Sequence, residues 1–488
     1  MGAMTVLRPY LPFDPEETTL SFANRLALIH TGRGMRHLLR DLNISAPSFV
    51  SGHVAETSAL AEMVGVEPEE LLANSIDVKQ THVSFRDQRL ARAFLSPRAA
   101  RFCPACLAAD GARECWRHRL IWGFRHVHRC DRHGLWLAHS GNASAEALPD
   151  AVSVSTFKQR DTVEDATPEY IGWLKSSLSN MSTPMSTWLE GQTLEQVLNA
   201  SEMLGAVLEH GHGVKIKKLA PVEVEQATDI GFSIYREGPE AVTEALDTIY
   251  ATSPASAVQA RPLAYYGALF DWLDRRANAI DPGPIRDILR THITKHFAIE
   301  PGTNVLGEEI TVRTAYSFQA LSDTLGIHRQ RLSRILQKLG KVPMGASDQE
   351  SGRIVFDAAE ILPLIEDFQT AISLHDLPGH LGASKRQVEV LYRAGHLVPL
   401  IPAPERGAVR QVVFSRRHLE QFLSTIKDLD ELPDPAEGWH PVGYACQRGA
   451  GPFADLFTKI ISGELRALRA PRQHGVASLR VYLDDVIG

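Results

Sequence analysis

The 488-residue sequence has few cysteines, five in all, and no apolar run near the roughly 18 residues that a membrane span needs. No basic stretch followed by an apolar leader opens the chain, so nothing in it directs export. A glycine-rich phosphate loop, a Gly-x-Ser-x-Gly elbow and a kinase-like motif set are also missing. The carboxylates are scattered rather than clustered as in a nuclease. These absences predict a cytoplasmic, non-catalytic protein without a membrane partner.

The sequence also lacks an excess of basic residues. Its net charge is −7 at pH 7, so the surface as a whole does not attract nucleic acid. Any such contact must therefore come from local basic patches. The apolar fraction of 44% and the charged fraction of 22% are those of ordinary globular protein. A chain of this length is too long for a single hydrophobic core and is expected to divide into several modules.

Three of the five cysteines fall in one short unit. Cys103 and Cys106 are followed by 23 residues and then by Cys130 and His133, which gives the spacing C-x2-C-x23-C-x2-H. A two-residue gap lets one tight turn present a pair of ligands, and two such pairs complete the tetrahedral set that zinc prefers. Because all four positions are filled by protein, the pattern predicts a structural rather than a catalytic zinc ion.

Other interpretations of this unit stay open. The cysteines could be small buried apolar residues, a disulfide or a redox pair, although none of these explains a histidine at ligand spacing. Cys115 or His118 could replace one of the four ligands. The unit also carries several arginines and tryptophans, which either contact phosphate or single-stranded bases or form the core of a small metal knuckle.

A helix–turn–helix is predicted near residue 320. Leu321 and Leu325 lie inward on a first helix, Gly326 permits the turn, and Leu332 and Leu336 anchor a second helix. The predicted outward, DNA-contacting side chains of that second helix are His328, Arg329, Gln330, Arg331, Arg334 and Lys338. Arg and Gln are the residues that read guanine and adenine edges in the major groove. A helical hairpin with a solvated charged face would show the same pattern.

A second copy of this layout follows from Leu377 to Leu400. Its predicted DNA-contacting residues are Ser384, Lys385, Arg386, Gln387 and Arg393. Arg410 to Phe414 is expected to form the strand of a wing, and Ser415 to cap the next helix. A third, basic module is expected at the end of the chain. Tandem readers favour recognition of double-stranded DNA, which implies association with the nucleoid.

The predicted fold is mainly α and multi-module. Its predicted modules are an N-terminal helical domain (5–100), a zinc-binding knuckle (101–145), a helical middle domain (165–300), a helix–turn–helix module (305–372), a second, winged helix–turn–helix module (373–435) and a C-terminal basic module (440–488).

These residues resemble the TniQ/TnsD family of transposon target-selection proteins. The similarity is most specific in Arg101-Phe102-Cys103-Pro104-x-Cys106-Leu107, Asp110, Arg119-x-x-Trp122 and Cys130-x-x-His133-Gly134, and it includes the Glu-Thr-x-Leu-Ser-Phe segment from Glu17 to Phe22. It covers residues 5–300 well and the remainder more loosely. Many relatives carry a further Cys-Pro-x-Cys where this chain has His139-Ser140-Gly141, and this departure argues against a second zinc ion.

The resemblance implies a non-catalytic adaptor that selects an insertion site on DNA. It further implies recruitment of an AAA+ ATPase regulator and a transposase, with a homodimer or a guide-RNA effector complex as further partners. The long C-terminal part is more similar to the sequence-specific branch of the family. A sequence-specific transcription regulator is the alternative, and a zinc-dependent hydrolase or nuclease is a third hypothesis.

Overall fold

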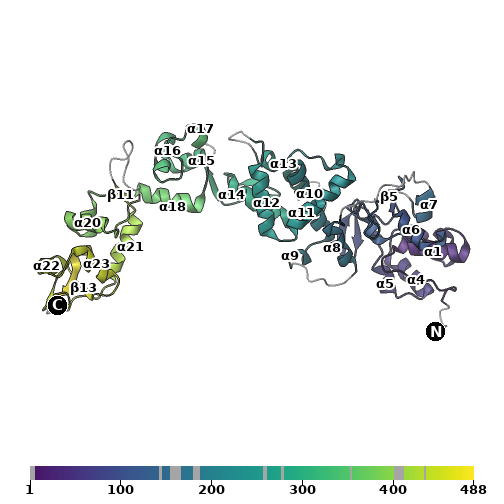
Figure 1. Ribbon diagram of the computed structural model, residues 1–488, viewed down its shortest axis with the longest axis horizontal. Helices are drawn as coiled ribbons and strands as arrows, with labels where there is room; N and C mark the ends of the chain where they lie inside the picture. Colours follow the sequence, from purple (N-terminus) through teal and green to yellow (C-terminus); the bar gives the residue numbers. More distant parts are fainter. Residues whose placement is uncertain are drawn as a thin grey trace. The chain divides into compact units, whose positions relative to one another are not determined.

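The computed structural model describes residues 6–141, 145–153, 166–179, 187–255, 261–275, 280–351, 354–400, 412–433 and 436–487. The fold is mainly α with small sheets of two or three strands, which confirms the predicted fold class (Figure 1). The chain forms two compact units. The first comprises residues 1–293 with 302–309, and the second comprises 294–301 with 310–488. None of the helices in the described ranges is long and apolar enough to cross a membrane.

Five short helices open the first unit. They are α1 (Thr19–Thr31), α2 (Met35–Asp41), α3 (Ala46–Val50), α4 (Val54–Val64) and α5 (Pro68–Leu72). Helix α1 begins where the Thr18 side chain accepts a hydrogen bond from the Ser21 amide, and it ends at Gly32, whose φ of 65° only glycine adopts easily. The apolar stripes of these helices bury one shared core that includes Phe22, Leu39 and Leu60.

An antiparallel sheet follows, in the order β1-β2-β3. Its strands are β1 (Asp77–Val78), β2 (His82–Phe85) and β3 (Gln88–Ala91). The turn between β2 and β3 consists of Arg86 and Asp87, with φ values of 47° and 63°, as a two-residue hairpin requires. The interpretation of residues 5–100 as helical did not include this sheet.

Further helices complete the first unit after the cysteine-rich segment. They are α7 (Leu148–Ser153), α8 (Glu169–Leu178), α9 (Thr187–Glu190), α10 (Leu194–His210), α11 (Pro221–Tyr235), α12 (Pro239–Ala251), α13 (Pro262–Asp274) and α14 (Ile285–His296), followed by the hairpin β6 (Thr303–Val305) and β7 (Glu308–Ile310). Helices α10 and α11 lie side by side at Gly205 and Gly231. A Cβ on either glycine would come within 1.8 Å of a carbonyl oxygen of the other helix, so the two backbones touch.

The second unit begins with the first predicted helix–turn–helix. Its elements are β8 (Ala315–Ser317), α15 (Phe318–Leu325), α16 (Arg329–Lys338), α17 (Asp348–Ser351), β9 (Val355–Asp357) and α18 (Ala358–Gln369). Gly326 ends α15 with a φ of 62°, as the sequence predicted for the turn. Leu321, Leu332 and Leu336 are buried in one hydrophobic core.

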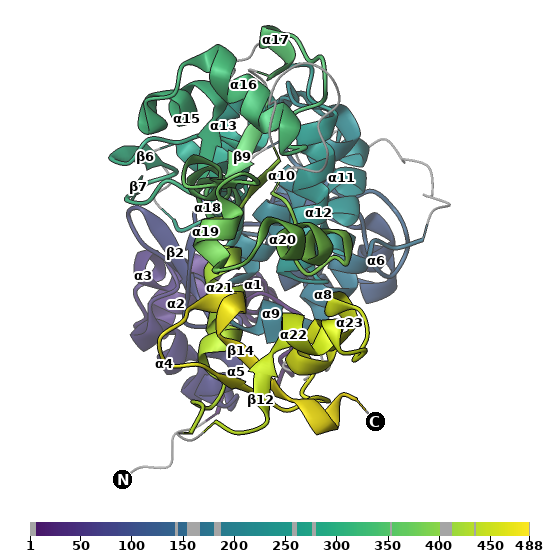
Figure 2. The same cartoon turned by 90° about the vertical axis from the view of Figure 1, so that its left-hand side faces the viewer.

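The remaining elements share a second core. They are β10 (Ile372–Ser373), α19 (Leu377–Leu381), α20 (Lys385–Arg393), β11 (Val413–Phe414), α21 (Arg416–Lys427), β12 (Trp439–Pro441), α22 (Val442–Gln447), α23 (Phe453–Ile461), β13 (Ala467–Arg469) and β14 (Leu479–Tyr482). Residues of both predicted modules, 373–435 and 440–488, contribute to this core. Helices α22 and α23 lie side by side beside the sheet of β12, β14 and β13 (Figure 2).

Candidate metal centre and nucleic-acid interface

The first two predicted ligands lie at the start of helix α6 (Pro104–Asp110). Strand β4 (Arg101–Phe102) pairs with β5 (Ala138–His139) and delivers Cys103 to the N-cap position of α6. Pro104 follows at the first helical position, where its missing N–H costs nothing. Cys106 comes three residues after Cys103, so the first turn of the helix brings both thiols to the same side. Both cysteines are buried.

The second pair lies in a tight turn. The Gly134 amide donates to the Cys130 carbonyl oxygen at 2.9 Å, and the Cys130 amide donates to the Leu135 carbonyl oxygen at 2.8 Å. Gly134 has a φ of 63°, a value that suits glycine in such a turn. The turn therefore places His133 opposite Cys130 and directs both toward α6.

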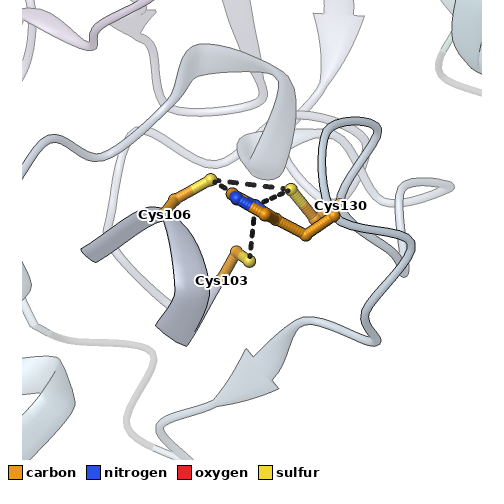
Figure 3. A group of neighbouring side chains, drawn as sticks. Cys103, Cys106 and Cys130 are labelled. Carbon is orange, nitrogen blue, oxygen red and sulfur yellow. Dashed lines mark hydrogen bonds between the residues drawn. The ribbon is translucent and has the colours of Figure 1, made fainter. Parts of the chain in front are cut away.

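The four predicted ligands meet in one cluster, and their ligand atoms all lie within 4.8 Å of one another. His133 Nδ1 is 3.3 Å from Cys106 Sγ and 3.6 Å from both Cys103 Sγ and Cys130 Sγ. Cys106 Sγ lies 3.6 Å from Cys130 Sγ. Figure 3 shows the three sulfur atoms converging from the helix and the turn. The cluster could hold a metal ion.

These separations fit a tetrahedral ion of the size of zinc. A Zn–S bond of about 2.3 Å implies sulfur atoms about 3.8 Å apart, and a Zn–N bond of about 2.0 Å implies nitrogen and sulfur about 3.5 Å apart. Hydrogen bonds with Cys106 and Cys130 lower the pKa of the Cys103 thiol. Hydrogen bonds with Cys103 and Cys130 raise the pKa of the Cys106 thiol. Three sulfur atoms this close cannot all be thiolates without a cation among them, which is the chemistry of a soft divalent ion.

Cys115 and His118, the two possible replacement ligands, do not belong to the cluster. Cys115 lies in a 3-10 helix, η1 (Arg113–Cys115), and is partly exposed. His118 is buried away from the cluster, with Nε2 3.0 Å from the Arg101 carbonyl oxygen. Burial lowers the pKa of His118 to about 4, so its ring is neutral.

Most of the arginines in the unit are structural. Arg101 donates to the carbonyl oxygens of Phe124 and Val127 at 2.6 and 2.7 Å. Arg119 is buried and paired with Asp14 at 2.8 Å and with Asp110 at 3.3 Å. Arg129 forms a buried pair with Glu225 on α11 at 2.7 Å. The sequence analysis gave Arg101 no role, although its position two residues before Cys103 indicated that it lies close to the ligand pair. The alternative that these side chains contact nucleic acid loses support, because their charges are used internally.

The first predicted reader helix, α16, exposes a row of polar and cationic side chains. The exposed predicted residues are His328, Arg329, Gln330, Arg331 and Arg334, whereas Lys338 is partly buried. In the described part of the chain, Arg331 and Arg334 form no salt bridge, and Arg329 stacks over the Phe318 ring at 5.8 Å. The sequence of α16 contains no acidic residue.

The second predicted reader helix, α20, differs from the first. Ser384 caps it, and Gln387 returns the bond, because the Ser384 amide donates to Gln387 Oε1 at 2.8 Å. Arg393 pairs with Glu389 at 2.6 Å. Lys385 and Arg386 are exposed. The strand β11 and the Ser415 cap lie where expected, and Arg410 of the predicted wing strand lies outside the described residues.

The family comparison agrees with these findings. Residues 9–137 match the TniQ family model, and this segment contains all four residues of the cluster. A comparison with curated proteins found no match to the chain. Proteins of the TniQ family are regulators or adaptors. The chain therefore carries a TniQ domain, the mark of a transposition-associated DNA-binding adaptor, and the resemblance predicted from the sequence is confirmed for residues 9–137.

Proposed function

We propose that this protein is a non-catalytic, zinc-containing adaptor that binds double-stranded DNA, selects the target site of a transposon, and recruits an ATPase regulator and the transposase. The observation that carries the proposal is a division between the two units. The TniQ domain holds the candidate metal site and uses its buried arginines internally, whereas α16 of the second unit turns an acid-free cationic face to solvent. A homodimer and a guide-RNA complex stay predictions.

Zinc fits the Cys103, Cys106, Cys130 and His133 set by donor chemistry and by spacing. A bound ion would join α6 to the Cys130–His133 turn and would supply folding energy rather than reaction chemistry. The neighbouring side chains support this structural role. Lys175 of α8 pairs with Asp131 at 2.7 Å, and Arg132 pairs with Glu16, so both residues between the last two ligands are tied to other elements of the first unit.

Duplex DNA is the ligand that the second unit fits best. The outward face of α16 combines arginine with glutamine, the side chains that form bidentate bonds to guanine and adenine. Its local positive charge contrasts with the net charge of −7 for the whole chain. Such a patch attracts phosphates locally while the rest of the surface repels them.

Fluorescence anisotropy with a panel of labelled duplexes tests DNA binding. The double variant Arg331→Ala/Arg334→Ala should weaken binding by about 1–3 kcal/mol for each base-reading contact that it removes. The matched control is Arg33→Ala/Arg113→Ala, which removes the same charge from exposed positions of the TniQ domain. The control should bind within about twofold of the unmodified protein. Equal weakening by both variants would mean that only total charge matters, which would contradict the assignment of α16.

A second experiment separates the adaptor from a transcription regulator. The protein is immobilised and presented with a purified AAA+ transposition ATPase, with and without DNA. An adaptor should retain the ATPase at micromolar concentration. A transcription regulator should bind the same DNA and retain no ATPase, and this result would favour the alternative function.

A further inference from the structure

The second unit repeats one arrangement three times. Each copy consists of a strand, a helix, a turn and a second helix, followed by a strand that pairs antiparallel with the first strand; α17 precedes that strand in the first copy, and β13 precedes it in the third. The copies are β8-α15-α16-β9, β10-α19-α20-β11, and β12-α22-α23 with β13 and β14. Positive-φ glycines, Gly326 and Gly382, end the first helix of the first two copies, and Gly449 and Gly451 lie in the same turn of the third. The three second helices can therefore be compared position by position.

Helix α16 presents a surface suited to reading bases. Gln330 and Arg334 are four residues apart and Arg331 lies between them, so the three share one exposed face. The opposite face, with Leu332, Ile335 and Leu336, is buried in the core of the first copy. No acidic side chain in α16 competes for the guanidinium groups.

Helix α20 has the same layout, but two of its candidate reading residues, Gln387 and Arg393, are engaged within the helix itself. Gln387, its only amide, is the acceptor of the capping box. Glu389 lies in the middle of the exposed face and pairs with Arg393. Lys385 and Arg386, at the start of the helix, are exposed and form no salt bridge among the described residues, whereas the exposed Arg393 is paired. Two exposed cations beside an amide whose oxygen is engaged in the cap suit phosphate oxygens, which carry no sequence information.

Helix α23 is turned inward. Leu456, Phe457 and Ile460 are buried, and α23 packs against α20. His396, just beyond α20, is bonded from Nε2 to Thr458 Oγ1 at 2.9 Å, and its ring contacts the Phe457 ring edge-on. The helix contains one lysine and one aspartate. Its packing supports the second copy and leaves no cationic row of the kind that α16 presents.

We infer that the three copies have different roles in DNA binding, in which α16 reads base edges, α20 binds the phosphate backbone, and α23 supports α20 without contacting bases. This inference rests on the proposed duplex binding and adds which copy determines the sequence preference. Base reading is strongest where an amide and a guanidinium group lie together on the outward face, and α16 combines Gln330 with Arg331 and Arg334, whereas the amide oxygen of Gln387 in α20 is engaged in the helix cap. Backbone binding needs only mobile positive charge.

The experiment selects a pool of randomised 24-base-pair duplexes on the full-length protein and sequences the bound fraction. Arg331→Ala/Arg334→Ala in α16 should change or erase the preferred sequence and weaken the preferred duplex about tenfold or more. Lys385→Ala/Arg386→Ala in α20 should keep the preferred sequence and weaken all duplexes alike. It should also lower the slope of log K against log salt by about 1 to 2. Lys459→Ala, an exposed change on α23, is the matched control and should alter neither quantity.

The possible outcomes distinguish a failure of the separate roles of the three helices from a failure of the proposed DNA binding. If the unmodified protein binds no duplex at 50 mM salt, the proposed function fails. If it binds and the α20 variant changes the preferred sequence, or the α16 variant weakens all duplexes uniformly, the assignment of separate roles is wrong while DNA binding stands. Circular dichroism of each variant shows that the fold survives, which is expected because all five substituted side chains are exposed.

Discussion

Glu17 and Arg25 form a salt bridge inside the TniQ domain, with 2.5 Å between Glu17 Oε2 and Arg25 Nη1. Glu17 is 0% and Arg25 5% exposed, so neither charge is screened by water. Ser21 Oγ donates to the other oxygen of Glu17 at 2.7 Å, and the His118 amide donates to Ser21 Oγ at 2.9 Å. The pair thus connects the first helix of the domain to the segment that holds the candidate metal site.

Removing one partner of this pair should strongly lower the stability of the protein. Arg25→Met leaves the Glu17 carboxyl buried without its partner and should lower the free energy of unfolding by about 3–5 kcal/mol. The matched control is Arg36→Met, which breaks the exposed pair with Glu146 and should cost about 1 kcal/mol or less. Urea unfolding monitored by circular dichroism measures both. If the two variants lost similar stability, the Glu17–Arg25 pair would not be a buried determinant of the fold.

If the clustered residues bind zinc, substitutions at two cysteines of the same segment should differ in their effect on zinc content and stability. Cys130→Ser removes one of the four clustered ligands, whereas Cys115→Ser changes a thiol outside the cluster. The first variant should lose its zinc and unfold locally, because ligand binding there is folding energy. The second should keep one zinc ion per chain and its thermal stability. Elemental analysis of the purified proteins measures the metal content, and an unmodified folded chain without zinc would contradict the assignment.

Short-range patterns carried most of what the sequence predicted. The two-residue gaps between Cys103 and Cys106 and between Cys130 and His133 encode turns that bring ligands together, and all four residues meet in the structure. Gly326 and Gly382 occur where a helix must end in a left-handed residue. Such features depend on a few neighbouring residues, and this is why a single sequence reveals them.

Features set by distant partners were not predicted. The sheet from Asp77 to Ala91 has strands of two to four residues, too short for alternation to stand out from a helical pattern. The role of Gln387 was missed although Ser384-x-x-Gln387 matches a capping box, because an exposed glutamine beside arginines also suggests a base reader. The salt bridge between Arg129 and Glu225 joins residues 96 positions apart, and no local sequence pattern predicts it.

His118 should make the stability of the first unit depend on pH. Burial lowers its pKa to about 4, its Nε2–H donates to the Arg101 carbonyl oxygen, and its Nδ1 has no partner among the described residues. Between pH 6.5 and 4 the unfolded state therefore binds a proton that the folded state does not, so stability is complete above pH 6.5 and falls as the pH falls. From the two pKa values, lowering the pH from 7.5 to 5.5 should cost on the order of 1 kcal/mol through this group.

The variant His118→Gln tests the dependence, because glutamine keeps a donor near Nε2 and does not titrate. Urea unfolding is measured at pH 7.5 and 5.5 for both proteins. Acid weakens the cysteine and histidine ligands equally in the two proteins, so the difference between them isolates His118. The unmodified protein should lose on the order of 1 kcal/mol more than the variant over this range. Parallel losses would mean that His118 titrates normally in the folded state.

Alanine should have opposite effects on stability at two helical glycines, Gly205 at the contact between α10 and α11 and Gly172 in α8. A Cβ at Gly205 would lie 1.8 Å from the Ala227 carbonyl oxygen, so Gly205→Ala must force the two helices apart. Overpacking of this kind should cost about 1–3 kcal/mol or more. Gly172 lies inside helix α8, and a Cβ there would meet nothing within 4 Å. Gly172→Ala should therefore stabilise the protein by about 0.5–1 kcal/mol through helix propensity and a less flexible unfolded chain. Urea unfolding of both variants at pH 7.5 gives the two signs, and a Gly205→Ala protein as stable as the unmodified one would show that the two helices do not meet backbone to backbone.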